Sequence, residues 1–318
     1  MGELSVDRPS EVVLAARVAR QYYLEGASKI DIAAQLGISR FRVARLLESA
    51  RDSGMVHIEI GLPGGSLDAG LSAELCSAFG LKQAFVFRFP DDDEAALRHR
   101  LGEATGEALM DLITPDDVLG ISWSRALSGL AAALTRLPPC PIVQLTGAVP
   151  PPDGQDLLEV VRSVARISGG PAHVFYAPMI LDSAQAAGTV RRQADVAEAF
   201  ALLPSVTMAL VAVGAWGPGH STIYDAITPA EREAIAGLGV CAEIAGAFLN
   251  ADGQPVETAL DSRMIVTPGS ALTQIPAILA VAYDVARCHA VRAALRGEIV
   301  NGLVTHTSLA RALLDLGS

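Results

Sequence analysis

The chain has 318 residues, of which 51% are hydrophobic and 19% are charged. This length corresponds to about two domains at the usual ~100–200 residues each, and the composition supports a large buried core and excludes a disordered chain. No apolar run approaches the ~18 residues of a membrane span, and the polar N-terminus has no apolar secretory-signal region. We therefore expect a cytoplasmic protein without membrane contact.

Cysteine and histidine usage gives no sign of a metal centre. No two of the four cysteines have the short spacing of a metal clip, and four thiols in so long a chain do not suggest a disulfide scaffold. The six histidines include no HExxH or similar pairing. We expect buried, reduced thiols and neither a metal ion nor a cofactor.

Charge is distributed unevenly along the chain. Residues 1–60 contain eight basic and eight acidic side chains, whereas residues 61–318 contain 16 and 27, which accounts for the whole net charge of −11. Within the first part, residues 36–51 carry four arginines and one glutamate. A neutral module with one basic helix ahead of an acidic body indicates a nucleic-acid-binding domain joined to a second domain.

Three helices are expected in the first 53 residues. Apolar residues at helical spacing over residues 12–23, among them Val12 and Val13, predict the first helix. A second helix covers Lys29–Leu36 and ends at Gly37, as the turn of a helix-turn-helix often does. Ser39 is a good N-cap for a third helix.

The third helix is expected to run to about Ser53, and its two faces differ in chemistry. At about 100° per residue, one side is apolar and must pack on the first two helices: Val43, Leu46, Leu47 and Ala50. The other side presents Phe41, Arg42, Arg45 and Ser49. Arginine can bond guanine bidentately, and an apolar ring can meet a thymine methyl group. Residues 55–60 alternate enough to predict a short strand, which could form a wing.

This exposed face predicts a DNA-reading surface. Ser39 and Arg40 would hold the phosphate backbone, while Phe41, Arg42, Arg45 and Ser49 would face the major groove. The alternative is a solvated basic face, which many helices have; the exposed phenylalanine favours DNA. One short helix reads few base pairs, so we expect several subunits on an inverted repeat.

The first 60 residues resemble the SorC family of sugar-responsive bacterial transcription regulators. The match covers nearly all of residues 12–60 and is carried by these segments: Ala16-Arg17, Tyr22-Tyr23, Ile32-Ala33, Leu36–Arg40, Arg45–Leu47 and Gly54–Val56. The resemblance implies operator binding under the control of a sugar or sugar-phosphate effector, in a homotetramer.

Beyond a turn-rich linker at residues 61–66, apolar runs alternate with amphipathic stretches. The predicted strands are Ala84–Phe89, Val118–Ser122, Ile142–Thr146, His173–Tyr176, Val206–Val213 and Met264–Thr267. The predicted helices include Glu94–Leu112, Arg125–Arg136, Leu157–Ser168, Val190–Leu203 and Val281–Leu295. This alternation predicts an α/β fold with a mainly parallel sheet, in which ligands bind outside the carboxyl ends of strands.

Three loops are expected at such strand ends. The first, Gly120–Ser124, offers two hydroxyls before Arg125 and suits a phosphate or sugar hydroxyls. The second is the glycine-rich segment 214–221, and the third is Thr267–Ser270. Each could also be an ordinary connection without a ligand.

The resemblance to the SorC family continues to the C-terminus, around Asp117–Gly120, Gly214, Gly239–Phe248 and Ala290–Leu295. It implies a Rossmann-like effector domain similar to sugar-phosphate isomerases and coenzyme A transferases. Glu243 stands at the family's acidic position, where it would accept bonds from sugar hydroxyls. The implied effector-binding residues are Ser122, Trp123, Ser124, Arg125, Gly214, Glu243 and Arg287.

Departures from the family pattern suggest an altered ligand. Ser124 and Ala126 replace the usual glycine and threonine, so one phosphate-contacting hydroxyl is lost. Arg287 replaces a lysine and keeps the charge as a planar fork; alternatively, it is a solvated helix charge paired with Asp284. His306 replaces an aspartate. Arg162 or Arg166 could supply a further anion contact, or both could be solvated.

Enzyme interpretations are weaker. Residues 120–124 nearly match the G-x-S-x-G elbow of hydrolases, but Ser124 replaces the last glycine. A sugar-phosphate isomerase fits the fold better but has no use for a basic recognition helix. We therefore predict a non-enzymatic regulator, with a helix-turn-helix DNA-binding domain at residues 1–60 and an effector-binding and oligomerisation domain at residues 61–318.

Overall fold

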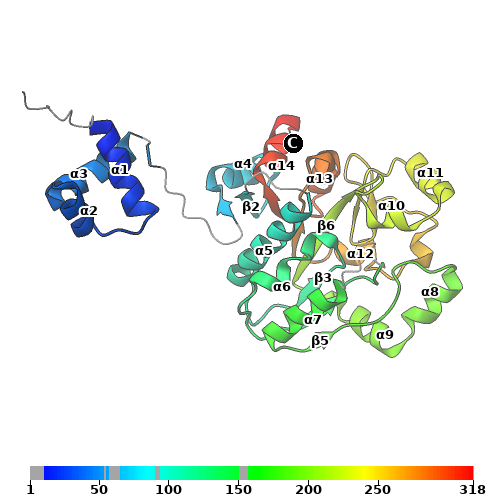
Figure 1. The fold of residues 1–318 in the computed structure, drawn as a ribbon. Coiled ribbons are helices and arrows are strands. Elements are labelled where there is room, and N and C mark those ends of the chain that lie inside the picture. Colours follow the sequence, from blue (N-terminus) through cyan, green and yellow to red (C-terminus); the bar gives the residue numbers. More distant parts are fainter. Residues whose placement is uncertain (1–10, 54, 57–64, 90–93, 150–156, 318) are drawn as a thin grey trace, which may run out of the picture. The chain divides into compact units, whose positions relative to one another are not determined.

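The computed structural model describes residues 11–53, 55–56, 65–89, 94–149 and 157–317 (Figure 1). The chain divides into two compact units, residues 1–60 and 61–318. Each unit is considered by itself below.

The first unit contains the three predicted helices, α1 (Glu11–Tyr23), α2 (Lys29–Leu36) and α3 (Arg40–Asp52). Gly37 ends α2 in the left-handed conformation, with φ +63°, which glycine adopts without a Cβ penalty. The Ser39 hydroxyl then accepts a hydrogen bond from the Arg42 amide and caps α3. The tight turn between the two helices follows from these two residues. The strand predicted for residues 55–60 lies mostly outside the described residues.

The core of this unit confirms the apolar face of α3 and corrects that of α1. Its buried residues are Ala15, Val18, Ala19, Ile32, Val43, Leu46, Leu47 and Ala50. Val12 and Val13 are instead 65% and 58% exposed. The side of α1 that carries Ala15 and Ala19 packs against the other helices, whereas the side that carries Val12 and Val13 does not.

The second unit is built on a sheet whose strands run in the order β1-β2-β10-β9-β6-β3-β4-β5. All neighbours in this order are parallel except β1 and β2. The strands are β1 (Ser66–Leu67), β2 (Gln83–Arg88), β3 (Leu119–Ile121), β4 (Ile142–Gln144), β5 (Ala172–His173), β6 (Met208–Ala215), β9 (Ala277–Val281) and β10 (Gly302–His306). The predicted α/β class with a mainly parallel sheet is confirmed.

Helices cover both faces of this sheet (Figure 1). One hydrophobic cluster joins the strands to α4 (Ala69–Phe79), α13 (Cys288–Arg296) and α14 (Thr307–Leu316). A second cluster joins their other face to α5 (Glu94–Leu112), α6 (Leu130–Ala133) and α7 (Leu157–Ser168). The remaining helices are α8 (Ala184–Arg191), α9 (Ala194–Ala201), α10 (Thr222–Ala226), α11 (Pro229–Gly237) and α12 (Gly269–Leu272).

Several predicted elements differ from the structure. Residues 264–267 form only isolated bridges and no strand, whereas β9 and β10 were not predicted. The helix predicted from Val281 starts only at Cys288, because residue 281 ends β9. The helix predicted over residues 190–203 is divided into α8 and α9, and that over residues 125–136 into a 3-10 helix, Arg125–Leu127, and α6.

The long strand β6 belongs to two sheets. Residues 208–212 pair with β9 and residues 208–210 also with β3, while Val213–Ala215 pair with β7 (Ala242–Ile244), which continues into β8 (Ala247–Leu249). Parallel pairing places the carboxyl ends of β3, β6 and β9 at one edge of the sheet. The loops that follow these strands therefore meet there.

Candidate functional site

The exposed face of α3 carries the side chains predicted to read DNA. Ser39, Arg40, Phe41, Arg42, Arg45 and Ser49 are all exposed. Phe41 is 78% exposed, and the Arg40 guanidinium lies 5.8 Å from the centre of its ring. An exposed phenylalanine beside arginines provides both contact types that distinguish bases in a major groove.

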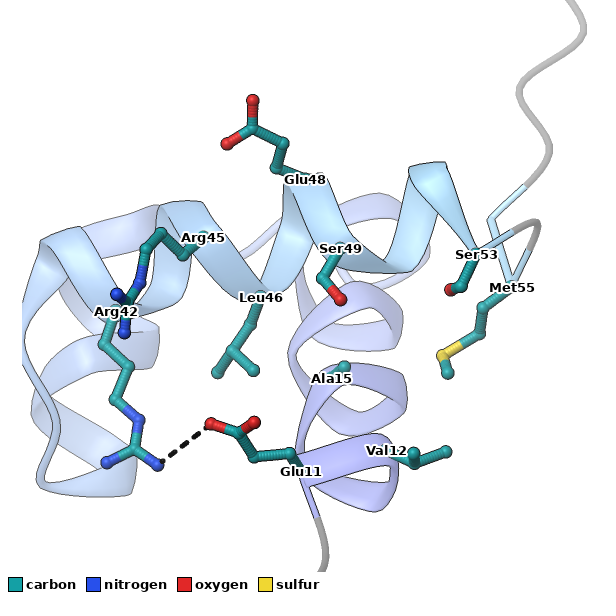
Figure 2. A pocket seen from close by; sticks show the side chains of 10 residues that line it. All are labelled: Glu11, Val12, Ala15, Arg42, Arg45, Leu46, Glu48, Ser49, Ser53 and Met55. Carbon is teal, nitrogen blue, oxygen red and sulfur yellow. Dashed lines mark ion pairs between the residues drawn. The ribbon is translucent and has the colours of Figure 1, made fainter.

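An open groove lies between α1 and α3, next to the exposed face of α3. In Figure 2, Arg42 and Arg45 extend from α3 on one side of the groove and Glu11 and Val12 lie on α1 on the other. The Arg42 guanidinium lies 3.7 Å from the Glu11 carboxylate. Both side chains are exposed, so this ion pair contributes about 0–1 kcal/mol and leaves Arg42 free to form other contacts.

In the second unit, a small pocket collects the predicted effector-binding loops. Its lining residues are Ser122, Trp123, Ser124, Met179, Ala212, Thr222, Ile223, Glu243, Ala245 and Gly246. Four of these residues were predicted to bind the effector: Ser122, Trp123, Ser124 and Glu243. The structure brings them together although Ser122 and Glu243 are 121 positions apart in the sequence. The pocket has a volume of about 30 Å³, enough for one or two water molecules.

The first loop follows β3 and supplies two hydroxyls and an indole. The Ser122 amide donates to the Leu210 carbonyl of β6, and the Trp123 amide donates to the Thr146 hydroxyl at 2.9 Å. These bonds fix the loop on the neighbouring strands. The Ser124 hydroxyl accepts from the Ala126 amide, so the replacement of glycine by serine provides this turn with its own cap.

Glu243 on β7 supplies the carboxylate of the pocket. It accepts from the Gly246 amide and, at 3.4 Å, from the Ser221 hydroxyl. Burial raises the pKa of the Glu243 carboxyl, although these bonds and the nearby charges of Arg287 and Arg125 favour ionisation. A carboxylate in this setting can accept hydrogen bonds from ligand hydroxyls.

Gly214 lies next to Glu243 in the β6–β7 ladder and makes room for it. A Cβ atom at position 214 would overlap the Glu243 carboxylate. Gly214 is not among the residues that line the pocket, but it leaves the space that the Glu243 carboxylate occupies.

Arg287 lies beside the pocket and not in its lining. Its side chain is buried, with an exposed fraction of 4%. It donates to the Tyr283 hydroxyl at 2.7 Å and to the His220 carbonyl, and its guanidinium lies 4.4 Å from the centre of the Tyr283 ring. The alternative of a solvated charge paired with Asp284 is therefore wrong. Asp284 instead lies 3.1 Å from His220.

Arg125 contacts the carbonyl next to the one that Arg287 contacts. It donates to the Gly219 carbonyl at 3.1 Å and lies 4.0 Å from the Asp225 carboxylate. The other proposed cations are elsewhere: Arg162 and Arg166 lie within 4 Å of Glu159 on α7. Arg125 and Arg287 are thus the two arginines whose charges act on Glu243.

Sequence reasoning missed several residues of this cluster. Ser221 contacts Glu243, and the His220 carbonyl and the Tyr283 hydroxyl accept from Arg287. Asp284 lies 3.1 Å from the His220 ring. His220 and Ser221 belong to the predicted loop 214–221 but were not named as effector-binding residues, and Asp284 was named only as a possible partner of Arg287. The glycine-rich composition of residues 214–221 was the signal for His220 and Ser221, and none existed for Tyr283. Within the described ranges, no group of three or more metal-ligating side chains is placed to hold an ion, and no helix is long and apolar enough to cross a membrane.

A small helical unit with an exposed cationic face, followed by a Rossmann-like unit with a polar pocket at its strand ends, is the arrangement expected of a ligand-responsive DNA-binding regulator. Comparison with known proteins agrees. A family model described as "Putative sugar-binding domain" matches residues 66–315. The transcriptional regulator LsrR of Klebsiella pneumoniae is 33% identical over 97% of this chain and 95% of its own length.

The LsrR of an Enterobacter species is 32% identical over 96% of this chain and 94% of its own length. In fold, the chain is similar to the full-length sorbitol operon regulator SorC of Klebsiella pneumoniae, with a TM-score of 0.70 over 96% of this chain and 99% of that one, at 22% identity. The chain belongs to the SorC-type family of transcriptional regulators with a sugar-binding domain.

Proposed function

We propose that α3 binds operator DNA and that the pocket at the ends of β3, β6 and β9 binds the effector. The proposed effector site is supported by three kinds of side chain that lie together at one edge of the sheet. Ser122 and Ser124 offer hydroxyls, Glu243 offers a carboxylate, and two arginines lie next to that carboxylate. This combination suits a small polyol that carries an anionic group, such as a sugar phosphate.

The DNA-binding half rests on the exposed face of α3. Arg42 and Arg45 would contact base edges, while Ser39 and Arg40 would contact phosphates. Phe41 and Ser49 complete this face. The protein would act in the cytoplasm as a homotetramer on an inverted repeat, since one such helix reads too few base pairs for useful specificity.

The effector would control operator affinity by binding two conformational states differently. A ligand shifts an equilibrium only by its differential affinity for the two states. The reciprocal effect must hold as well, so operator DNA should change the affinity for the effector by the same factor.

A screen of sugars and sugar phosphates tests this proposal. The full-length protein would be melted in the presence of each compound, because a ligand that binds only the folded state raises the melting temperature. Each hit would then be added to the protein on labelled DNA from upstream of its own gene. A hit that changes DNA affinity supports the proposal, and a panel without such a compound would contradict it.

The alternative function is a sugar-phosphate isomerase, which the Rossmann-like fold permits. Ribose 5-phosphate and amino-sugar phosphates would be incubated with the protein and assayed for turnover. We expect none, because the exposed cationic face of α3 has no role in such a reaction. Turnover that Glu243→Gln abolishes would instead support an enzyme.

A further inference from the structure

The loop of residues 217–221, which we call the lid loop, is held in place by the two arginines beside the effector pocket. The Gly219 carbonyl accepts from Arg125 at 3.1 Å, and the His220 carbonyl accepts from Arg287. Two neighbouring backbone carbonyls thus occupy the guanidiniums that were expected to bind an anion.

The lid loop has further contacts with the residues around it: the Gly219 amide donates to the Asp225 carboxylate at 3.0 Å, and the His220 ring lies 3.1 Å from Asp284. The Ala215 amide donates to the His220 carbonyl and the His220 amide donates to the Gly217 carbonyl, both at 3.2 Å. Before it, Trp216 is anchored by edge-on contacts with Tyr224 and Phe248, with ring centres 5.2 and 5.4 Å away. Trp216 is thus fixed directly before the loop, and Gly217, beside which a Cβ atom would meet no other atom within 4 Å, lies in open space directly after Trp216.

The pocket is too small for a sugar while the lid loop is in this position. Its volume of about 30 Å³ is bounded by Thr222 and Ile223, which directly follow the loop. The Ser221 hydroxyl contacts Glu243 at 3.4 Å and so ties the end of the loop to the pocket's carboxylate. Thr222 and Ile223 are the first residues of α10, so a displacement of the loop that also moves the start of this helix would enlarge the pocket on this side.

Arg287 retains an unused donor in this arrangement. Its Nε atom is buried and has no hydrogen-bond partner among the described residues. A buried guanidinium that is bonded to a neutral carbonyl and a phenol would form stronger, charge-assisted bonds with an oxyanion. Arg125 is partly exposed; it donates to a neutral carbonyl, that of Gly219, and lies 4.0 Å from the Asp225 carboxylate. An oxyanion would offer it a stronger bond than this carbonyl does.

We propose that the anionic group of the effector competes with the lid-loop carbonyls for Arg125 and Arg287, so that effector binding releases the loop. The bonds to Gly219 and His220 are replaced by bonds to the oxyanion, and the pocket opens as the loop leaves. The inference rests on the proposed function of this pocket and adds how binding there is converted into movement. A phosphate and a carboxylate share the required chemistry.

The first test needs no ligand. Hydrogen–deuterium exchange of peptides covering residues 216–224 would be measured in the full-length protein and in the Arg125→Gln and Arg287→Ala variants. Each variant should exchange there about tenfold faster or more, because the bonds that hold the loop are lost. Arg166→Gln, which removes a guanidinium paired with Glu159 on α7, is the control. Arg125→Gln keeps the test valid if Arg287→Ala melts early, and wild-type exchange rates in Arg125→Gln would overturn the inference.

The second test uses inorganic phosphate and acetate as probes, with chloride at matched ionic strength. An oxyanion that competes for the arginines should speed exchange over residues 216–224 in the wild type and add nothing in an Arg125→Gln/Arg287→Ala double variant. The anion that increases the exchange rate more, phosphate or acetate, identifies the chemistry that the site prefers. If neither anion changes exchange in the wild type, or if they protect the loop, the inference is wrong.

DNA-binding measurements separate this inference from the proposed function. If a sugar phosphate changes DNA affinity while exchange at residues 216–224 stays constant, the release of the loop is wrong and the proposed function stands. If the loop is released by anions but no compound of the sugar panel affects DNA binding, the loop mechanism stands and the proposed function fails.

Discussion

Gly214 on β6 and Glu243 on β7 are paired residues of one antiparallel ladder, and any side chain at position 214 would occupy the space of the Glu243 carboxylate. The acid of the pocket is therefore positioned by the absence of a side chain on the adjacent strand. This relationship can be tested by filling the space.

Replacing Gly214 with alanine should displace the Glu243 carboxylate from its bonds with Ser221 and Gly246. The atoms in the way belong to the Glu243 side chain and not to the backbone, so this side chain can move aside. We expect effector affinity to fall about tenfold or more, which corresponds to the loss of ~1.4 kcal/mol. Titration calorimetry with a compound from the sugar screen measures the effect. Gly237→Ala, where a Cβ meets nothing within 4 Å, serves as the control. Unchanged affinity in Gly214→Ala would argue against a role for this space.

Arg45→Ala should weaken binding to the specific operator by about 1–3 kcal/mol and relax the preference at one base pair, because a bidentate contact to a base is lost. Fluorescence anisotropy on operator and on random DNA measures both. Arg51→Ala, an exposed arginine in the last turn of the same helix, should have a smaller effect. Equal losses on the two DNAs would show that Arg45 contacts only phosphate.

The raised pKa of Glu243 makes a prediction about pH. A carboxyl whose pKa is higher in the folded state binds its proton more tightly there, so the folded state loses stability as the pH rises from the ordinary glutamate value upward. Glu243→Gln removes this penalty. Its melting temperature should exceed that of the wild type at pH 8, and the difference should disappear near pH 4. A variant that is less stable at pH 8 would show that the Glu243 charge is stabilised by its surroundings.

Glu231 makes the opposite prediction. Bonds from the Thr228 hydroxyl and amide, together with Arg263, lower the pKa of Glu231 to about 2. These bonds form a capping box at the start of α11. The stabilisation is complete above the ordinary carboxyl pKa and is lost as the pH falls toward 2.

Glu231→Ala should therefore cost about 1–2 kcal/mol at pH 7, since the side chain is partly exposed. Denaturant unfolding at pH 7 and pH 2.5 measures this cost, which should shrink at the lower pH. Glu233→Ala, an exposed glutamate on the same helix, should change little. A cost that is the same at both pH values would exclude the charge as its cause.

Sequence periodicity was sufficient for α3 but not for the central strands. Val43, Leu46, Leu47 and Ala50 recur at helical spacing and are all buried, because an amphipathic helix has one apolar side. β9 (Ala277–Val281) is buried on both faces, so its sequence is continuously apolar and does not alternate. Such a run cannot be distinguished from the start of a buried helix. Its last residue, Val281, was taken as the start of the predicted helix that ends at Leu295, and the rest of the run was assigned to no element.

The same limit applies to the pocket. The hydroxyls of Ser122 and Ser124 could be placed at a strand end from the order of elements, and Glu243 was placed through the family resemblance. The contacts of Arg287 could not be foreseen, because they depend on β9 lying next to β6, which brings residue 287 to the His220 carbonyl. Strand order is set by packing between distant segments and leaves no local signal in the sequence.

The insertion of β10 between β2 and β9 has a consequence for synthesis on the ribosome. Gln83 of β2 pairs with Gly302, and β10 supplies the hydrogen bonds that join β2 to β9. The roughly 220 residues that separate β2 from β10 take on the order of 10–45 s to translate. During that interval β2 lacks its parallel neighbour β10. The residues that form the core of α1 to α3, in contrast, have all been synthesised once residue 56 is reached. A nascent chain therefore carries the complete three-helix unit well before the sheet of the second unit is complete, and a premature stop before residue 302 would leave β2 and β9 without the strand that joins them.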